Sequence, residues 1–162
     1  MNDSDKVKEL FDYDPKTGVL RWRVSRRGKT TPGQVAGNIQ GNGYRYVPFC
    51  GRLIGAHRVI WIYVNGVWPT GDIDHINRDR GDNRIENLRD VTRSQNMRNS
   101  IRKRTESSPY QGVCFDKESG KWMASITTDY KQIHLGRYPT AEEAHDAYVK
   151  ACKEIHGAYS AF

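Results

Sequence analysis

A polar segment around residue 100 divides this chain into two stretches, each of which must bury its own apolar side chains. Residues 100–108 are rich in Ser, Arg and Lys, contain few apolar side chains and are followed by a proline. This composition is typical of linkers. The total of 162 residues is enough for one domain or for two small ones. We therefore predict a domain over residues 1–99, a linker over 100–108 and a second domain over 109–162.

The excess positive charge lies in the first stretch and the linker. Residues 1–108 carry 20 Lys and Arg against 12 Asp and Glu, whereas residues 109–162 carry 6 against 7, which gives the net charge of +7. A chain with this excess of basic residues attracts anionic polymers. We expect Arg102, Lys103 and Arg104 to lie along phosphate groups, the alternative being a solvated loop.

The composition excludes a membrane protein and a disulfide-stapled secreted domain. The longest mostly apolar run, Val59 to Val64, is far shorter than the roughly 20 residues that cross a bilayer. The acidic N-terminus has no apolar core, so we expect no secretory signal. Cys50, Cys114 and Cys152 are too far apart in the sequence to indicate a zinc knuckle or a disulfide framework. We expect a cytoplasmic protein with no membrane contact and no obligate protein partner.

The first stretch is expected to combine short strands with two helices before residue 66. The apolar run over 56–65 does not distinguish a helix from a buried strand by periodicity, but Asn65-Gly66 is a good helix end and favours a helix. The other expected elements are a short helix over 6–11, a strand over 18–24 after a turn at 14–18, and a strand over 44–49 that turns at 50–52 into residues 53–54.

The segment from residue 72 to residue 99 is the most informative part of the chain. Residues 72–77 and 88–91 fit two short strands, and the residues between them are rich in Asp, Asn and Gly, as loops are. Thr92 and Gln95 form a capping box, which predicts a helix that begins near Arg93. The expected order is strand, loop, strand, helix.

The second stretch predicts a small two-layer domain. Three short strands are expected over 110–115, 121–127 and 132–138. A second capping box, Thr140 with Glu143, begins an amphipathic helix that ends at Gly157. We therefore predict an α+β protein whose second domain is a three-stranded antiparallel sheet packed on one helix.

Asp74 and His75, followed by Asn96 in the predicted helix, suggest a metal-assisted hydrolytic site. A neutral imidazole can take a proton from water, and Asp and Asn oxygens are ligands that Mg²⁺ prefers. On a regular strand Asp74 and His75 would point to opposite faces, so they must straddle the substrate or lie where the strand ends. An Asp-His pair is often merely structural. We interpret His57, before an apolar run, as a packed or capping residue.

Longer motifs around this pair resemble the HNH endonuclease family, most closely its phage-borne homing branch. They cover roughly residues 43–99 and comprise Ala56-His57-Arg58, Trp61, Gly66, Pro69, Ile73-Asp74-His75-Ile76-Asn77, residues 82–89 (DNRIENLR), Thr92 and Asn96-x-x-Asn99. The resemblance implies a ββα-metal nuclease unit, here with an N-terminal β-rich extension.

The HNH resemblance also implies a role for each residue of the site. His75 would be the general base, Asp74 and Asn96 would bind a divalent metal, and Asn87 would hold the loop or orient His75. The metal is expected to be Mg²⁺, with Mn²⁺ as a substitute. Many HNH enzymes have a histidine where this chain has Asn96, which leaves Asn99 as the alternative ligand.

The second stretch resembles the plant ethylene-response-factor type DNA-binding domain, which also occurs attached to phage HNH nucleases. The motifs are Ser108-Pro109-Tyr110-Gln111-Gly112-Val113, residues 120–126 (GKWMASI), His134-Leu135-Gly136-Arg137-Tyr138 and residues 140–144 (TAEEA). The family lays its sheet in the major groove of DNA. The resemblance implies that Trp122, Ala124 and Ile126 face the helix, and that Gln111, Met123, Ser125, Thr127, Gln132 and His134 face DNA. Gln111 and Cys114 stand where the plant family has arginines, so we expect weaker binding and different base preferences.

Together these patterns predict a metal-dependent endonuclease of the homing or mobile-element type that cuts double-stranded DNA, in the host cytoplasm if a phage encodes it. Four basic residues near the first predicted hairpin are expected to hold the duplex backbone: Arg21, Arg23, Arg26 and Arg27. The alternative is a non-catalytic, sequence-specific DNA-binding regulator that keeps the HNH scaffold. An RNA-binding module ranks below both, because no aromatic-rich RNA-binding strand is present.

Overall fold

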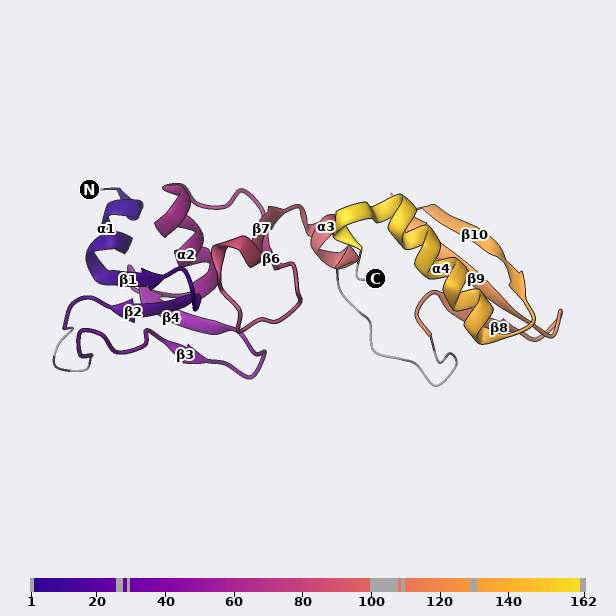
Figure 1. Cartoon of the computed structure of the whole chain (residues 1–162), viewed down its shortest axis with the longest axis horizontal. Coiled ribbons are helices and arrows are strands. Elements are labelled where there is room, and N and C mark those ends of the chain that lie inside the picture. Colours follow the sequence, from indigo (N-terminus) through magenta and orange to yellow (C-terminus); the bar gives the residue numbers. More distant parts are fainter. Residues whose placement is uncertain are drawn as a thin grey trace. The chain divides into compact units, whose positions relative to one another are not determined.

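The computed structural model describes residues 2–25, 28, 30–99, 108, 110–128 and 131–160, with the side chains of Arg98 and Ala158 left out. The chain divides into two compact units, Met1–Asn96 and Met97–Phe162 (Figure 1). Most of the predicted linker, with Arg102, Lys103 and Arg104, lies outside the described residues, and so do Arg26 and Arg27. Within the described ranges no helix is long and apolar enough to cross a bilayer.

The first unit begins with a capped helix and a hairpin. Helix α1 (Asp3–Leu10) starts earlier than predicted because the Asn2 side chain accepts a hydrogen bond from the Asp5 backbone N–H. Strands β1 (Phe11–Asp14) and β2 (Val19–Trp22) are antiparallel. The prediction that Phe11 ends the helix was wrong, because Phe11 pairs with Trp22 in this hairpin and its ring packs on the indole.

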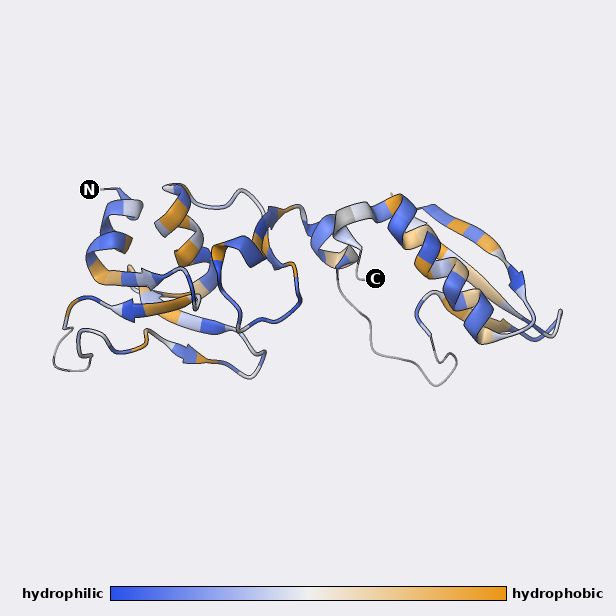
Figure 2. Ribbon diagram, viewed as in Figure 1, coloured by the Kyte–Doolittle hydropathy of each residue, from blue (hydrophilic) through white to orange (hydrophobic). Residues whose placement is uncertain are grey.

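A three-stranded sheet and a buried helix follow. Strands β3 (Asn38–Ile39), β4 (Arg45–Phe49) and β5 (Arg52–Gly55) pair in that order, and α2 (Ala56–Asn65) comes directly after β5. The predicted helix over 56–65 is confirmed, and it ends at Gly66 in the left-handed conformation. The colours of Figure 2 show that α2 is largely apolar. Its side chains pack in the core of the unit with those of α1, β1, β2 and β4.

The segment from residue 72 to residue 98 has the predicted order. Strand β6 (Asp72–His75) pairs antiparallel with β7 (Leu88–Val91), and a loop with a 3₁₀ turn, η1 (Ile85–Asn87), joins them. Helix α3 (Arg93–Arg98) begins at the predicted capping box: Thr92 N–H donates to Gln95 Oε1 at 2.9 Å and Gln95 N–H donates to Thr92 Oγ1 at 3.3 Å. Ile73 and Leu88 anchor the hairpin in the core.

The second unit is a three-stranded antiparallel sheet with one helix on it, as predicted. Strands β8 (Val113–Asp116), β9 (Lys121–Thr128) and β10 (Lys131–Tyr138) lie in the order β10-β9-β8. Thr140 caps α4 (Ala141–His156), which ends in the 3₁₀ turn η2 (Gly157–Tyr159). Ala124 and Ile126 are buried against residues of α4, which confirms the face predicted to meet the helix.

The β1–β2 hairpin supports the loop between β6 and β7. The Tyr13 hydroxyl donates to the Asn83 carbonyl oxygen at 3.3 Å and accepts from the Ile85 N–H at 2.9 Å. At the hairpin turn Gly18 has φ +72°, and a Cβ there would lie 2.5 Å from Arg84 N and 2.7 Å from Asn83 C. Only glycine fits this close backbone approach. The N-terminal extension therefore fixes the position of residues 83–85.

We predict that Gly18→Ala destabilises the protein more than Gly33→Ala does. Gly33 also has a positive φ, of +84°, but a Cβ there would meet nothing within 4 Å. Gly33→Ala should therefore cost only the left-handed backbone penalty, about 1–2 kcal/mol, and Gly18→Ala about 1–3 kcal/mol more for the forced displacement of the loop. Urea unfolding of both variants measures the difference. Equal free energies of unfolding would contradict the close packing of the hairpin on the loop.

Candidate functional site

His75 is the last residue of β6 and is 3% exposed. Asp74 and His75 therefore lie where the strand ends, which is one of the two arrangements expected if they act together. The imidazole Nε2 lies 3.0 Å from Oδ1 of Asn83, a residue of the loop that is itself buried. This contact, which the sequence did not reveal, fixes one edge of the ring.

Two more rings and a guanidinium surround His75. The His57 ring meets the His75 ring edge-on with centroids 5.5 Å apart, and Tyr44 lies 5.2 Å from His57 and 5.7 Å from His75. Arg80 stacks on Tyr44 with Cζ 4.9 Å from the ring centroid, and it donates to the Asn42 carbonyl at 2.6 Å. His57 was predicted to be a packed residue, and it is half-buried in this cluster, next to the candidate base.

Burial keeps both histidines in the neutral form. Desolvation lowers the pKa of His75, although the hydrogen bond that its Nε2 makes to Asn83 Oδ1 and the carboxylates of Asp74, Asp79 and Asp82 oppose the shift. Desolvation is the main cause that lowers the pKa of His57 to about 4 from the usual 6.5. Repulsion from the charge of Arg58, and from His75 when that ring is protonated, lowers the pKa of His57 further in the same direction. A neutral imidazole can accept a proton, which is what a general base requires.

Asp74 lies directly opposite Arg89 in the β6–β7 pair and forms an ion pair with it. Arg89 Nε and Nη2 lie 2.8 and 2.7 Å from Asp74 Oδ2, and both side chains are largely buried, at 17% and 8% exposed. The guanidinium therefore compensates the buried carboxylate. Arg89 could not be recognised as the partner of Asp74 from the sequence, because that partner depends on the register of the hairpin.

Asn96, in α3, lies on the same side of β6 as Asp74. Its Nδ2 donates to Asp72 Oδ2 at 3.2 Å, and Asp72 and Asp74 point to the same face because they are two residues apart on one strand. With the amide nitrogen used in this bond, the carbonyl oxygen of Asn96 is the atom available for a cation. Asn99, the alternative ligand, follows the last residue of α3.

Asn87 is hydrogen-bonded to the loop between β6 and β7. It accepts from the Asn77 N–H at 2.9 Å and donates to Asn77 Oδ1 at 2.9 Å and to the Asp82 carbonyl at 2.8 Å. Asp82 in turn binds Arg84 through two hydrogen bonds, which lower the pKa of Asp82 to about 2. Of the two roles expected for Asn87, these hydrogen bonds correspond to holding the loop.

The donor types of Asp74 and Asn96 fit a hard divalent cation. A carboxylate and an amide carbonyl are oxygen ligands, and Mg²⁺ typically takes few protein ligands and keeps several waters. Among the described residues no group of three or more His, Cys, Asp or Glu side chains forms a closed metal cage.

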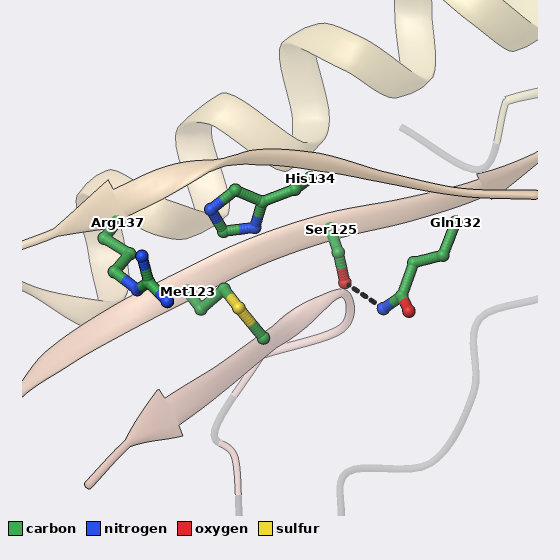
Figure 3. A pocket seen from close by; sticks show the side chains of 5 residues that line it. All are labelled: Met123, Ser125, Gln132, His134 and Arg137. Carbon is green, nitrogen blue, oxygen red and sulfur yellow. Dashed lines mark hydrogen bonds between the residues drawn. The ribbon is translucent and has the colours of Figure 1, made fainter. Parts of the chain in front are cut away.

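In the second unit, the sheet face away from α4 carries most of the residues predicted to contact DNA. Met123, Ser125, Gln132 and His134 line one shallow hollow of about 330 Å³ together with Arg137 (Figure 3). Gln132 Nε2 donates to Ser125 Oγ at 2.9 Å. Thr127, the register partner of Gln132, is exposed on the same face. Arg137, missed in the sequence, lies opposite Met123 and pairs with Asp116 at 2.9 Å.

The other residues predicted to contact DNA lie elsewhere. Gln111 is half-buried and donates a hydrogen bond to the Tyr148 hydroxyl on α4 at 3.2 Å. Its contact with DNA stays a prediction. Arg21 and Arg23 are exposed on and after β2, and they donate to the Gly33 and Lys8 carbonyls at 3.0 and 2.9 Å. Both guanidiniums therefore also brace the first unit.

Comparison with protein families confirms both resemblances. Residues 55–98 match the HNH endonuclease model, and residues 108–158 match the AP2 domain model. The chain thus contains an HNH endonuclease domain, which supports a nuclease at the level of the family, and an AP2 domain, which indicates DNA binding. HNH nucleases generally use divalent metals, and the HNH match spans α2, β6, β7 and α3.

The relatives include plant transcription factors and a phage protein. Over 54 residues, 33% of this chain, the chain is 39% identical to the AP2-like ethylene-responsive transcription factor TOE2 of Arabidopsis thaliana and to the APETALA2-like protein 2 of Oryza sativa subsp. japonica. It spans only 11% and 12% of those plant proteins. It is 27% identical to Protein 3.8 of Escherichia phage T7 over 107 residues, 65% of this chain and 88% of that protein. No solved structure gives a significant match.

We predict that His57 makes the stability of the protein depend on pH. Its folded pKa of about 4 lies below the usual 6.5, so the unfolded chain binds more protons between these values. The free energy of unfolding should therefore fall as the pH drops from about 6.5 to about 4. His57→Gln cannot take up this proton and should lose that part of the slope. Urea unfolding across this pH range tests it, and parallel curves for wild type and variant would contradict it.

Proposed function

We propose that this chain is a metal-dependent HNH endonuclease, of the homing or mobile-element type, that hydrolyses phosphodiester bonds in double-stranded DNA. The observation that carries the proposal is the pair Asp74 and His75 at the end of β6, both buried, in a segment that matches HNH endonucleases. The T7 relative supports a phage setting and hence the host cytoplasm.

In this proposal His75 is the general base. Its buried ring is neutral near pH 7, so it can take a proton from the water that attacks the phosphate. A positioned base of this kind contributes roughly 10²–10⁴ in rate. Asn83 on Nε2 and His57 against the ring restrict the imidazole to one orientation, which is the preorganisation that catalysis needs.

Asp74 and Asn96 would hold the divalent metal, with Mg²⁺ expected and Mn²⁺ as a substitute. When bound, such an ion stabilises the negative charge that develops on the phosphate and on the leaving oxygen. Arg89 fixes the Asp74 carboxylate from the neighbouring strand. Asp72 accepts a hydrogen bond from Nδ2 of Asn96, which turns the carbonyl oxygen of Asn96 away from Asp72. Asn87 would keep the loop folded around His75.

We further propose that the AP2 domain contributes affinity and site preference. The face of β9 and β10 away from α4 presents Met123, Ser125, Thr127, Gln132 and His134, and strands of this kind can enter the major groove. This face carries little net charge, because Arg137 is paired with Asp116. The basic linker, with Arg102, Lys103 and Arg104, and the arginines from Arg21 to Arg27 would then supply phosphate contacts. We place the domains at 1–99 and 109–162.

The rival proposal is a DNA-binding regulator that retains the HNH scaffold without cutting. One observation favours it: the candidate metal ligand Asp74 is already engaged by a buried arginine. A regulator would bind DNA through the same surfaces but would need neither His75 nor the metal.

We predict that His75→Ala abolishes DNA cleavage and leaves DNA affinity close to that of wild type. The variant loses the base, worth roughly 10²–10⁴ in rate, whereas affinity rests on basic and sheet residues elsewhere. Single-turnover cleavage and fluorescence anisotropy on the same duplex measure the two quantities. His156→Ala, at the end of α4, is the control for loss of a histidine. Cleavage by His75→Ala at the wild-type rate would refute the assignment.

We predict that Gln132→Glu weakens DNA binding about 10-fold and that Gln111→Glu weakens it less. Both changes are isosteric and add one negative charge, but Gln132 lies on the outer sheet face and Gln111 is bonded to Tyr148. A carboxylate facing phosphates is repelled, and the repulsion is screened by salt. Anisotropy titrations of a mixed-sequence duplex at two salt concentrations test it. Equal losses in the two variants would argue against the outer face as the binding surface.

A further inference from the structure

The Asn83 side chain can meet His75 in only one orientation. Its amide Nδ2 faces the Gly81 carbonyl oxygen at 3.4 Å, so its Oδ1 is the atom turned to the imidazole, 3.0 Å from Nε2. With the amide reversed, two oxygens would face each other at Gly81 and the nitrogen of the amide would face the imidazole. The carbonyl of Gly81 therefore selects Oδ1 as the acceptor for His75.

The position of Asn83 is itself fixed from outside the loop. Asn83 is 5% exposed, its backbone carbonyl accepts from the Tyr13 hydroxyl, and the turn at Gly18 packs on its backbone. The bond to His75 joins two buried side chains across eight residues of chain. A hydrogen bond between groups held this firmly has a well-defined direction, because neither partner can turn to water.

We infer that Asn83 is a positioning residue that fixes His75 in the tautomer with its proton on Nε2. An amide oxygen only accepts, so Nε2 must carry the hydrogen. In a neutral imidazole the other nitrogen then holds the lone pair, so Nδ1 is the atom that accepts a proton. The inference deepens the proposed function and rests on it for its catalytic meaning. The tautomer itself is a property of the folded chain that can be measured without DNA.

The direct test is NMR of the ¹⁵N-labelled full-length protein, near neutral pH and without metal or DNA. Long-range ¹H–¹⁵N correlations separate a protonated ring nitrogen from an unprotonated one, and the signals of His75 are those that His75→Gln removes. We expect Nε2 of His75 to be protonated and Nδ1 to be unprotonated. A His75 with its proton on Nδ1, or an even mixture of tautomers, overturns the inference without any Asn83 variant.

Three variants separate the hydrogen bond from general loosening of the loop. Asn83→Leu keeps the side-chain size but removes the acceptor, and should shift His75 toward the other tautomer. Asn83→Asp sets its second oxygen against the Gly81 carbonyl, where the amide donates in the wild type, but it keeps an accepting oxygen toward His75 and should retain the Nε2 proton. Tyr13→Phe removes the support of the loop backbone without touching the ring, and should leave the tautomer unchanged. An unchanged tautomer in Asn83→Leu, or in Asn83→Ala if the leucine variant does not fold, overturns the inference.

Cleavage rates link the tautomer to catalysis. Asn83→Leu should cut about 10- to 100-fold more slowly, as when the hydrogen-bond partner of a functional histidine is removed, with DNA affinity unchanged. Asn83→Asp should recover much of this loss. If His75→Ala cuts like wild type, the proposed function fails while the NMR result stands. If His75→Ala is inactive but Asn83→Leu keeps both the wild-type tautomer and the wild-type rate, the role of Asn83 alone fails.

Discussion

The antiparallel pairing of β6 with β7 is the constraint on which the candidate active site depends. It sets Arg89 opposite Asp74, ends β6 at His75 and starts α3 where Asn96 reaches Asp72. The loop between the strands is held by Asn87 from within and by the β1–β2 hairpin from outside. Asp74, His75 and Asn87 are buried, and each has a partner, which is the condition under which polar and charged groups are tolerated in a small core.

In the proposed endonuclease the two units would have different tasks. The proposed chemistry lies in the first unit, and residues 1–108, which include the linker, carry the excess positive charge and hence the attraction to phosphate. The sheet of the second unit presents an almost neutral outer face of polar side chains, with Arg137 paired to Asp116. Such a face is suited to reading base edges rather than to strong non-specific attraction.

The sequence predicted local structure better than it predicted contacts. The capping box at Thr92 and the end of α2 at Gly66 depend on a few adjacent residues, and both were predicted correctly. The strand at Phe11 was missed because its pairing with Trp22 lies outside any local window. The contact from Asn83 to His75 could not be predicted, because it depends on the path of the loop and on the distant hairpin that supports it.

The most direct test of the account is cleavage of supercoiled plasmid by the purified full-length protein with Mg²⁺, with and without EDTA. A metal-dependent endonuclease should give nicked or linear product with Mg²⁺ and none with EDTA, and the ratio of the two products distinguishes single-strand from double-strand cutting. Plasmid that is bound, as judged by gel shift, but stays supercoiled with Mg²⁺ and with Mn²⁺ would contradict the account. That result would identify the protein as a DNA-binding regulator instead.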